Sequence, residues 1–82
     1  EYSLLIARLE PENNIATIIQ GYILSDSKFP LIIIGNNNTK YGRFLKMTYT
    51  DSRIIFLGAI YDINILNNLR YFSNIRFFIL FL

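Results

Sequence analysis

Four continuous apolar segments divide the chain at fairly regular intervals. They occupy residues 2–7, 31–34, 53–57 and 75–82, and each is rich in Ile, Leu or Phe. Within each segment apolar residues follow one another with little polar alternation. This pattern is typical of strands buried on both faces, as in parallel sheets that helices cover. We therefore expect a strand at each of the four positions.

The intervals between these segments have helical periodicity. In the first interval, apolar residues recur at i, i+3, i+4, i+7 and i+8 from Ile15, with Pro11 suited to the first turn and Ser25 to the end of the helix. Thr39 and Asp62 are suited to N-cap the second and third helices. The expected stripes of those two helices are Tyr41, Phe44, Leu45, Thr48 and Ile65, Leu66, Leu69, Phe72. We expect the aromatic side chains Tyr22, Phe44, Tyr71 and Phe72 to pack in the core.

Strands that alternate with helices predict an α/β fold in which parallel strands are joined by crossover helices. The chain has 82 residues, enough for one small domain, and its net charge is only +2. It contains no Cys and no His, so a Cys-His or Ser-His-Asp catalytic arrangement cannot be built from its side chains. Its cations are scattered along the sequence and predict no nucleic-acid partner. We expect no metal and no other cofactor.

Ligands of open α/β sheets bind at the carboxyl ends of the strands. The loops expected there are 8–12, 35–39 and 58–62. Arg8 lies at the start of the first loop, where its guanidinium could bind phosphate beside helix N-termini or could pair with Glu10 or Glu12. The second loop contains consecutive Asn residues, which favour a turn. Gly58 could permit a tight turn or the close approach of a ligand.

Four segments in this order resemble the retaining GT-B glycosyltransferases known as glycosyl transferases group 1, and within them the rhamnosyltransferase-like branch. The segments are 6–14 (IARLEPENN), 32–36 (IIIGN), 53–58 (RIIFLG) and 66–74 (LNNLRYFSN). The resemblance implies that residues 1–82 form one partial, nucleotide-sugar-binding domain. It would be a three-layer Rossmann-like half-domain, with four parallel strands alternating with three helices, from the C-terminal part of a bacterial enzyme of polysaccharide biosynthesis.

The resemblance also implies roles for particular residues. Arg8 matches the family's arginine that contacts the donor diphosphate, and two loops match segments near the nucleotide. Asn13 stands where the family has a lysine, so one phosphate-binding cation is missing. The family's downstream carboxylates would lie beyond Leu82, so we expect no catalytic residue here and little or no activity from this chain alone. The expected nucleotide-proximal residues are Gly35 and Asn36 in one loop and Gly58, Ala59 and Ile60 in the other.

The implied partner is a nucleotide-diphosphate sugar donor, and the implied location is the cytoplasm, where the full enzyme could lie against the inner membrane. The alternative is a non-catalytic α/β binding or interaction module, which the absence of His, Cys and a clear carboxylate pair supports. The apolar segment 75–82 is too short to span a bilayer. As an apolar edge strand it would invite pairing, so we expect a homo-oligomer through these residues.

Overall fold

A computed structural model describes residues 2–73 and 75–79, with side chains described for residues 2–73. Strands and helices alternate along the chain, as expected. The strands are β1 (Ser3–Ala7), β2 (Leu31–Ile34), β3 (Ile54–Gly58) and β4 (Ile75–Ile79). The helices are α1 (Ile15–Leu24), α2 (Lys40–Thr48) and α3 (Ile63–Phe72), and a short 3-10 turn, η1 (Pro11–Asn13), precedes α1. Residues 80–82 of the last expected strand lie outside the described residues.

The strands form a parallel sheet in the order β3-β2-β1-β4. Leu4 on β1 lies opposite Ile32 on β2, which in turn lies opposite Ile55 on β3. The pairing of β2 with β3 shifts at the end, so that Ile34 lies opposite Gly58. The expected α/β architecture with a parallel sheet is therefore confirmed.

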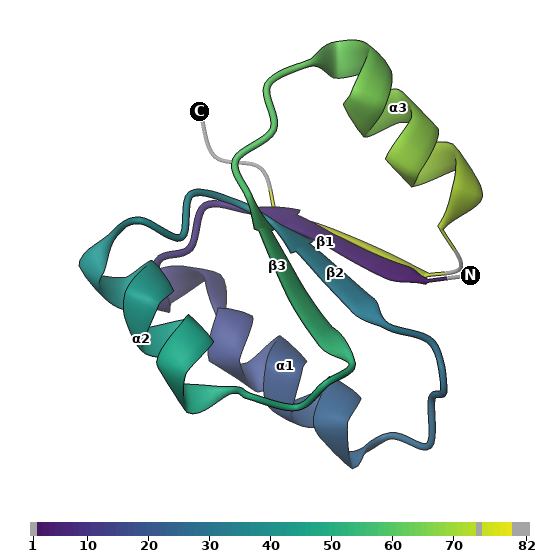
Figure 1. Cartoon of the computed structure of the whole chain (residues 1–82). Helices are drawn as coiled ribbons and strands as arrows, with labels where there is room; N and C mark the ends of the chain where they lie inside the picture. Colours follow the sequence, from purple (N-terminus) through teal and green to yellow (C-terminus); the bar gives the residue numbers. More distant parts are fainter. Residues whose placement is uncertain (1, 74, 80–82) are drawn as a thin grey trace.

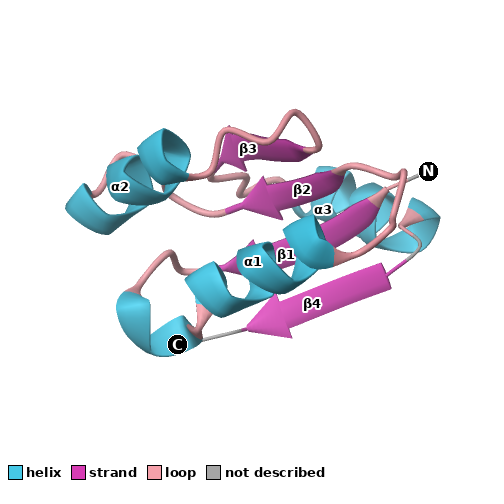
Figure 2. Cartoon of the chain, turned by 90° about the horizontal axis from the view of Figure 1, so that it is seen from below, coloured by secondary structure: helices cyan, strands magenta, loops and turns pink. Residues whose placement is uncertain are grey.

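The three helices are divided between the two faces of the sheet (Figures 1 and 2). Helices α1 and α2 lie on one side and α3 lies on the other. This division follows from the strand order, because right-handed crossovers that step from β1 to β3 place their helices on one face. The connection from β3 to β4 runs back past β1, which places α3 on the opposite face.

The face under α1 and α2 carries a closed hydrophobic core. Alternate strand residues point toward it, and they meet the apolar stripe of α1 and Leu45 of α2. Ile15 and Ile19 of α1 are fully buried, which confirms the stripe that was expected there. The buried cluster consists of Leu5, Ala7, Leu9, Ile15, Ile19, Leu31, Ile33, Leu45 and Ile54.

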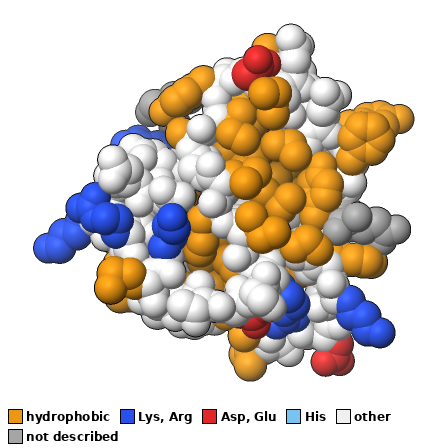
Figure 3. Space-filling model, in the orientation of Figure 1, with side chains coloured by type: hydrophobic (Ala, Val, Ile, Leu, Met, Phe, Trp, Pro, Cys, Tyr) orange, Lys and Arg blue, Asp and Glu red, His pale blue; other side chains and the backbone are white. Residues whose placement is uncertain are grey.

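The face under α3 is only partly covered, contrary to the expectation that every strand is buried on both faces. Helix α3 has no buried residue, and on β3 the side chains of Ile55 and Leu57 are 38% and 48% exposed. Figure 3 shows a broad area of hydrophobic side chains on this side of the sheet. One helix leaves β3 uncovered here, whereas two helices cover the other face.

The prediction that Phe44, Tyr71 and Phe72 pack in the core is wrong, and these residues lie on helices on both sides of the sheet. Phe44 is 51% exposed on the outer side of α2, and Tyr71 and Phe72 are 76% and 65% exposed on α3. Tyr22 does pack against the core. Among the described residues, no helix is long and apolar enough to cross a membrane.

Helix α1 begins later than Pro11, where the sequence pattern placed its first turn. Residues Pro11–Asn13 form η1, and Asn14 then adopts a left-handed conformation with φ 57°. A residue at positive φ cannot continue a right-handed helix, so α1 starts at Ile15. The helix ends as predicted, with Ser25 at its C-cap. Gly21 has open space beside it, so no neighbouring atom requires a glycine at this position of α1.

The two predicted N-caps are confirmed. The Thr39 hydroxyl accepts a hydrogen bond from Gly42 N at 3.0 Å at the start of α2. The Asp62 carboxylate accepts from Asn64 N at 2.9 Å and from Ile65 N at 3.3 Å at the start of α3. Each cap satisfies backbone donors that have no partner inside the helix.

Arg53, which precedes β3, ties the carboxyl end of α1 to the sheet. Its Nη2 donates to Ile23 O at 2.9 Å and its Nη1 to Ser27 O at 2.8 Å, and its guanidinium lies 5.3 Å from the centre of the Tyr22 ring. Arg53 also pairs with Asp51, with 3.1 Å between Nη2 and Oδ2. Asp51 is therefore ion-paired, and hydrogen bonds from Arg53 lower its pKa.

Candidate functional site

The loops that follow β1, β2 and β3 meet at one end of the sheet and line a single pocket of about 410 Å³. Its lining comes from residues 6–10, from 34–36 with Thr39, and from 59–61. All strands of a parallel sheet end on the same side, so their following loops converge. The pocket therefore lies where strand-end geometry places a ligand site, and it includes five of the six predicted residues: Arg8, Gly35, Asn36, Ala59 and Ile60.

Arg8 lies at the rim of this pocket, directly after β1. Its side chain is 58% exposed, and its Nη2 lies 2.7 Å from Oε1 of Glu10. The pairing with Glu10 is one of the two alternatives that the sequence left open. Exposed ion pairs of this kind contribute about 0–1 kcal/mol. An anionic ligand could therefore displace Glu10 from Arg8 at low cost.

Asn13 holds the loop that carries Arg8. Its side chain is only 3% exposed, and its Nδ2 donates to Arg8 O at 2.7 Å. Its Oδ1 is buried and has no hydrogen-bond partner among the described residues. Sequence reasoning treated Asn13 only as a missing cation. The available signal was an Asn-Asn pair after a proline turn, a context in which side-chain amides bond to nearby backbone.

Gly35 allows the β2 loop to lie against the end of β1. A Cβ atom at this position would overlap Ala7 O and would press on the Leu9 side chain. Its N–H donates to Gly58 O at 3.0 Å, which joins the second loop to the third. Packing alone thus requires glycine here. The neighbouring Asn36 accepts a hydrogen bond from Asn38 N at 3.0 Å, in the turn that its sequence favoured.

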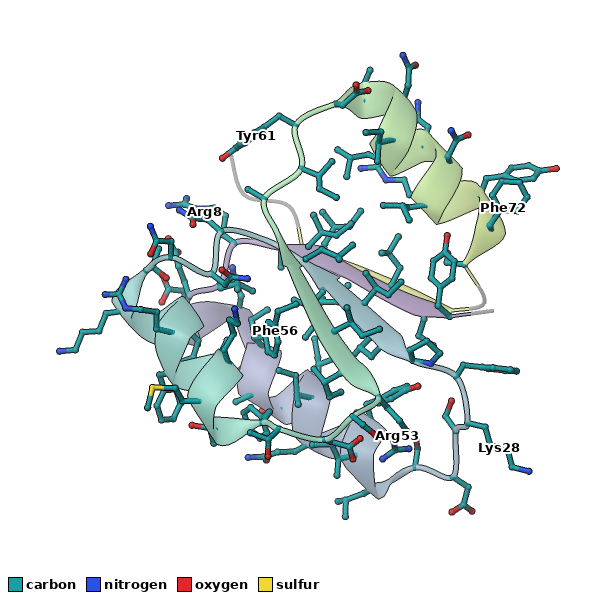
Figure 4. All side chains as sticks on the ribbon, viewed as in Figure 1. Arg8, Lys28, Arg53, Phe56, Tyr61 and Phe72 are labelled. Carbon is teal, nitrogen blue, oxygen red and sulfur yellow. The ribbon has the colours of Figure 1, made fainter. Side chains whose placement is uncertain are left out.

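Gly58 closes β3 with a φ of +83°, a conformation that glycine adopts readily. Gly58 itself is not part of the pocket lining, but the chain it redirects places Ala59, Ile60 and Tyr61 there. Tyr61 is 88% exposed and was not predicted as a site residue. Figure 4 shows Tyr61 and Arg8 at the same end of the sheet. The signal for Tyr61 was a large aromatic residue in a strand-end loop.

The helix N-termini contribute less to this pocket than expected. The first loop enters the lining only as far as Glu10, because η1 separates the pocket from the start of α1. At the second loop Thr39 lines the pocket, but its hydroxyl already caps α2. Arg8 is therefore the main source of positive charge in the lining, and Glu10 offsets it in the absence of a ligand.

No group of three or more Asp, Glu, His or Cys side chains is arranged to hold a metal ion anywhere in the described part of the chain. The resolved pKa shifts belong to Asp51 and Arg53 at the opposite end of the sheet. The chemistry that this pocket offers is thus binding of an anion by one arginine, beside an exposed aromatic ring.

The chain was compared with protein-family models, with curated proteins and with solved structures, and none of the three comparisons found a match.

Proposed function

We propose that this chain is the donor-binding part of a glycosyltransferase, similar to the rhamnosyltransferase-like enzymes that its sequence resembles. The observation that supports the proposal most is the convergence of three strand-end loops on one pocket with Arg8 at its rim. The strand order is compatible with one half of a doubly wound, Rossmann-like domain. The ligand would be a nucleotide-diphosphate sugar, from which the sugar passes to a polysaccharide or glycan acceptor.

In this proposal Arg8 leaves Glu10 and binds the donor diphosphate. A guanidinium presents parallel N–H groups that match phosphate oxygens, and it remains charged at any physiological pH. The same positive charge would stabilise the diphosphate as it leaves the sugar. The exposed ring of Tyr61 would pack against an apolar face of the base or sugar.

Titration with nucleoside diphosphates such as UDP and GDP, followed by amide NMR shifts, tests the proposal. We expect shifts at Arg8, Gly35 and the 59–61 loop. Arg8→Ala removes a charge-assisted contact and should weaken binding about tenfold or more. Glu10→Gln removes the competitor of the phosphate and should strengthen binding about twofold to fivefold.

Lys28→Ala is the matched control, because Lys28 is an exposed cation that does not line the pocket. It should leave the affinity unchanged. Absence of shifts, or shifts that Arg8→Ala leaves intact, would contradict the donor-site proposal. That result would favour the alternative of a non-catalytic interaction module, for which the exposed apolar face at Ile55 and Leu57 is the specific support.

We also propose that the chain self-associates through β4. This strand pairs with β1 and lies at the edge of the sheet order, so its other edge offers backbone groups for pairing with a second copy. Sedimentation at rising concentration should show a dimer or larger species. A monomer at the highest concentration would exclude this association.

A further inference from the structure

The outer side of α2 combines positive charge with exposed apolar side chains. Gly42 and Leu45 face the protein and are buried. On the other side, Phe44 and Met47 are 51% and 81% exposed. Exposed cations lie among them at helical spacing, and Figure 3 shows blue side chains gathered over α2. We define the α2 outer face as Lys40, Arg43, Phe44, Lys46 and Met47.

The charge of this face is not neutralised locally. Residues 27–50 contain no Asp or Glu. The ion pairs within the described residues are Arg8–Glu10 and Arg53–Asp51, and neither involves α2. Arg43 donates to the Asn38 carbonyl at 3.2 Å, a neutral partner that leaves its charge in place.

Two acidic residues, Glu10 and Glu12, flank Pro11, and neither forms an ion pair with an α2 side chain within the described residues. Glu10 is already paired with Arg8. Pro11 lines a shallow apolar hollow of about 470 Å³ together with Lys40, Tyr41 and Phe44. In this hollow the Tyr41 and Phe44 rings are stacked, with 5.8 Å between their centres. The hollow extends the apolar part of the α2 outer face, and the cations border it.

We propose that the α2 outer face docks on an anionic membrane surface. The interface of an anionic membrane presents negative headgroups directly above an apolar layer. It can therefore bind the cations of the α2 outer face and, one side-chain length deeper, its apolar side chains. Phe44 and Met47 would enter the interface, while the longer cationic side chains would stay at headgroup level. Nucleic acid would match the charge but would leave the exposed Met47 without an apolar partner.

The length of α2 and its position beside the strand-end pocket determine how the chain would lie on a membrane. Helix α2 has 9 residues, so it would lie along the surface, and its binding would be reversible and sensitive to salt. Thr39 caps α2 and also lines the strand-end pocket. Docking would therefore hold the rim of that pocket close to the membrane. The inference depends only on the α2 outer face and does not require the proposed glycosyltransferase function.

Cosedimentation of the whole chain with vesicles tests this proposal. We expect binding to vesicles that contain phosphatidylglycerol, much weaker binding to pure phosphatidylcholine, and loss of binding as salt rises. Lys40→Gln should weaken binding about fivefold, since one cation near an anionic surface contributes on that scale. The double variant Phe44→Ser with Met47→Ser should weaken it about tenfold or more, because two apolar anchors are lost.

Two control variants carry the same chemical changes elsewhere. Lys28→Gln removes an exposed cation outside α2, and Leu24→Ser removes an 85% exposed apolar side chain at the end of α1. Both should bind vesicles as the unaltered chain does, and circular dichroism should show that all variants are folded. Equal binding to neutral vesicles, equal losses in the control variants, or no vesicle binding at all would overturn the proposal. So would a finding that Phe44 and Met47 serve only association between copies of the chain.

Discussion

The two faces of the sheet are built from alternate residues of the same strands, yet they differ in how completely they are covered. Ile33 points toward α1 and α2 and is fully buried, whereas Ile55, on the neighbouring strand and the other face, is 38% exposed. Helices α1 and α2 contribute buried side chains, and α3 contributes none. The α3 face buries Leu4 and Ile34 on the two central strands but leaves Ile55 and Leu57 of β3 exposed, whereas the other face is closed along β3 as well.

The largest effect is expected from an isoleucine-to-alanine substitution made once on each face of the sheet, which tests the difference in coverage. Ile33→Ala removes fully buried atoms and should lower the free energy of unfolding by about 2–5 kcal/mol, since it leaves a cavity in a closed core. Ile55→Ala removes atoms that are already partly in water and should cost less than half as much. Urea denaturation followed by circular dichroism measures both. Equal losses would mean that the two faces are equally well packed in solution.

Glycine substitutions compare a crowded position at the pocket end of the molecule with an open one on the solvent side of α1. Gly35→Ala would force a Cβ against the Ala7 carbonyl and should cost about 1–3 kcal/mol. Gly21→Ala, on the solvent side of α1, meets no atom within 4 Å and should stabilise the chain by about 0.4–1 kcal/mol. Thermal melts of the two variants should shift in opposite directions. A neutral Gly35→Ala would show that the two loops can separate without loss.

The positions of the strands could be predicted because each one is a continuous apolar segment bounded by turn residues. The sequence could not predict which face of a strand is covered by a helix. Coverage depends on the side of the sheet to which each crossover connection carries its helix. Ile55 and Leu57 look like core residues in the sequence and are exposed, since only α3 lies on their side. The start of α1 was predicted too early because Pro11 is favourable at a helix N-terminus. The left-handed backbone conformation of Asn14, which delays the helix, is not evident from the sequence.

The location of the candidate site could be predicted, because the carboxyl ends of parallel strands converge on one edge of the sheet. Arg8, Gly35 and Ala59 follow three different strands and line one pocket, although the binding of a sugar donor there remains a prediction. Asn13 was missed because its role is a buried hydrogen bond to Arg8 O, which composition and spacing do not reveal. Likewise, the pairing of Arg8 with Glu10 depends on side-chain conformations that the sequence leaves open.

A third prediction compares the N-caps of helices on the two faces. Asp62→Ala and Thr39→Ala each remove a cap worth about 0.5–2 kcal/mol. On α3 the loss should appear as local opening, because no α3 side chain is buried in the sheet. On α2, Leu45 is fully buried, so the loss should lower global stability. Hydrogen exchange of the helix amides, measured alongside urea denaturation, separates the two outcomes, and identical exchange profiles would contradict the difference.

The smallest expected effect is a pH dependence that comes from the closed face. Arg53 lowers the pKa of Asp51 below its usual 3.8, chiefly through side-chain hydrogen bonds. A carboxylate with a lowered pKa in the folded state stabilises the fold above its unfolded pKa, and this contribution is lost as the pH falls through the folded value. The stability difference between the unaltered chain and Asp51→Asn should therefore be constant above about pH 5 and should shrink below about pH 4.

Asp26→Asn is the matched control, since Asp26 is an exposed aspartate in the same region of the molecule. Arg53 anchors the carboxyl end of α1 through Ile23 O and Ser27 O, and its Nε and Nη2 groups also donate to the Asp51 carboxylate. Loss of Asp51 should thus loosen the end of α1 first and should leave α3 unaffected. If acid instead increased the exchange of α3 amides before those of α1, the connection between this ion pair and the closed face would be refuted.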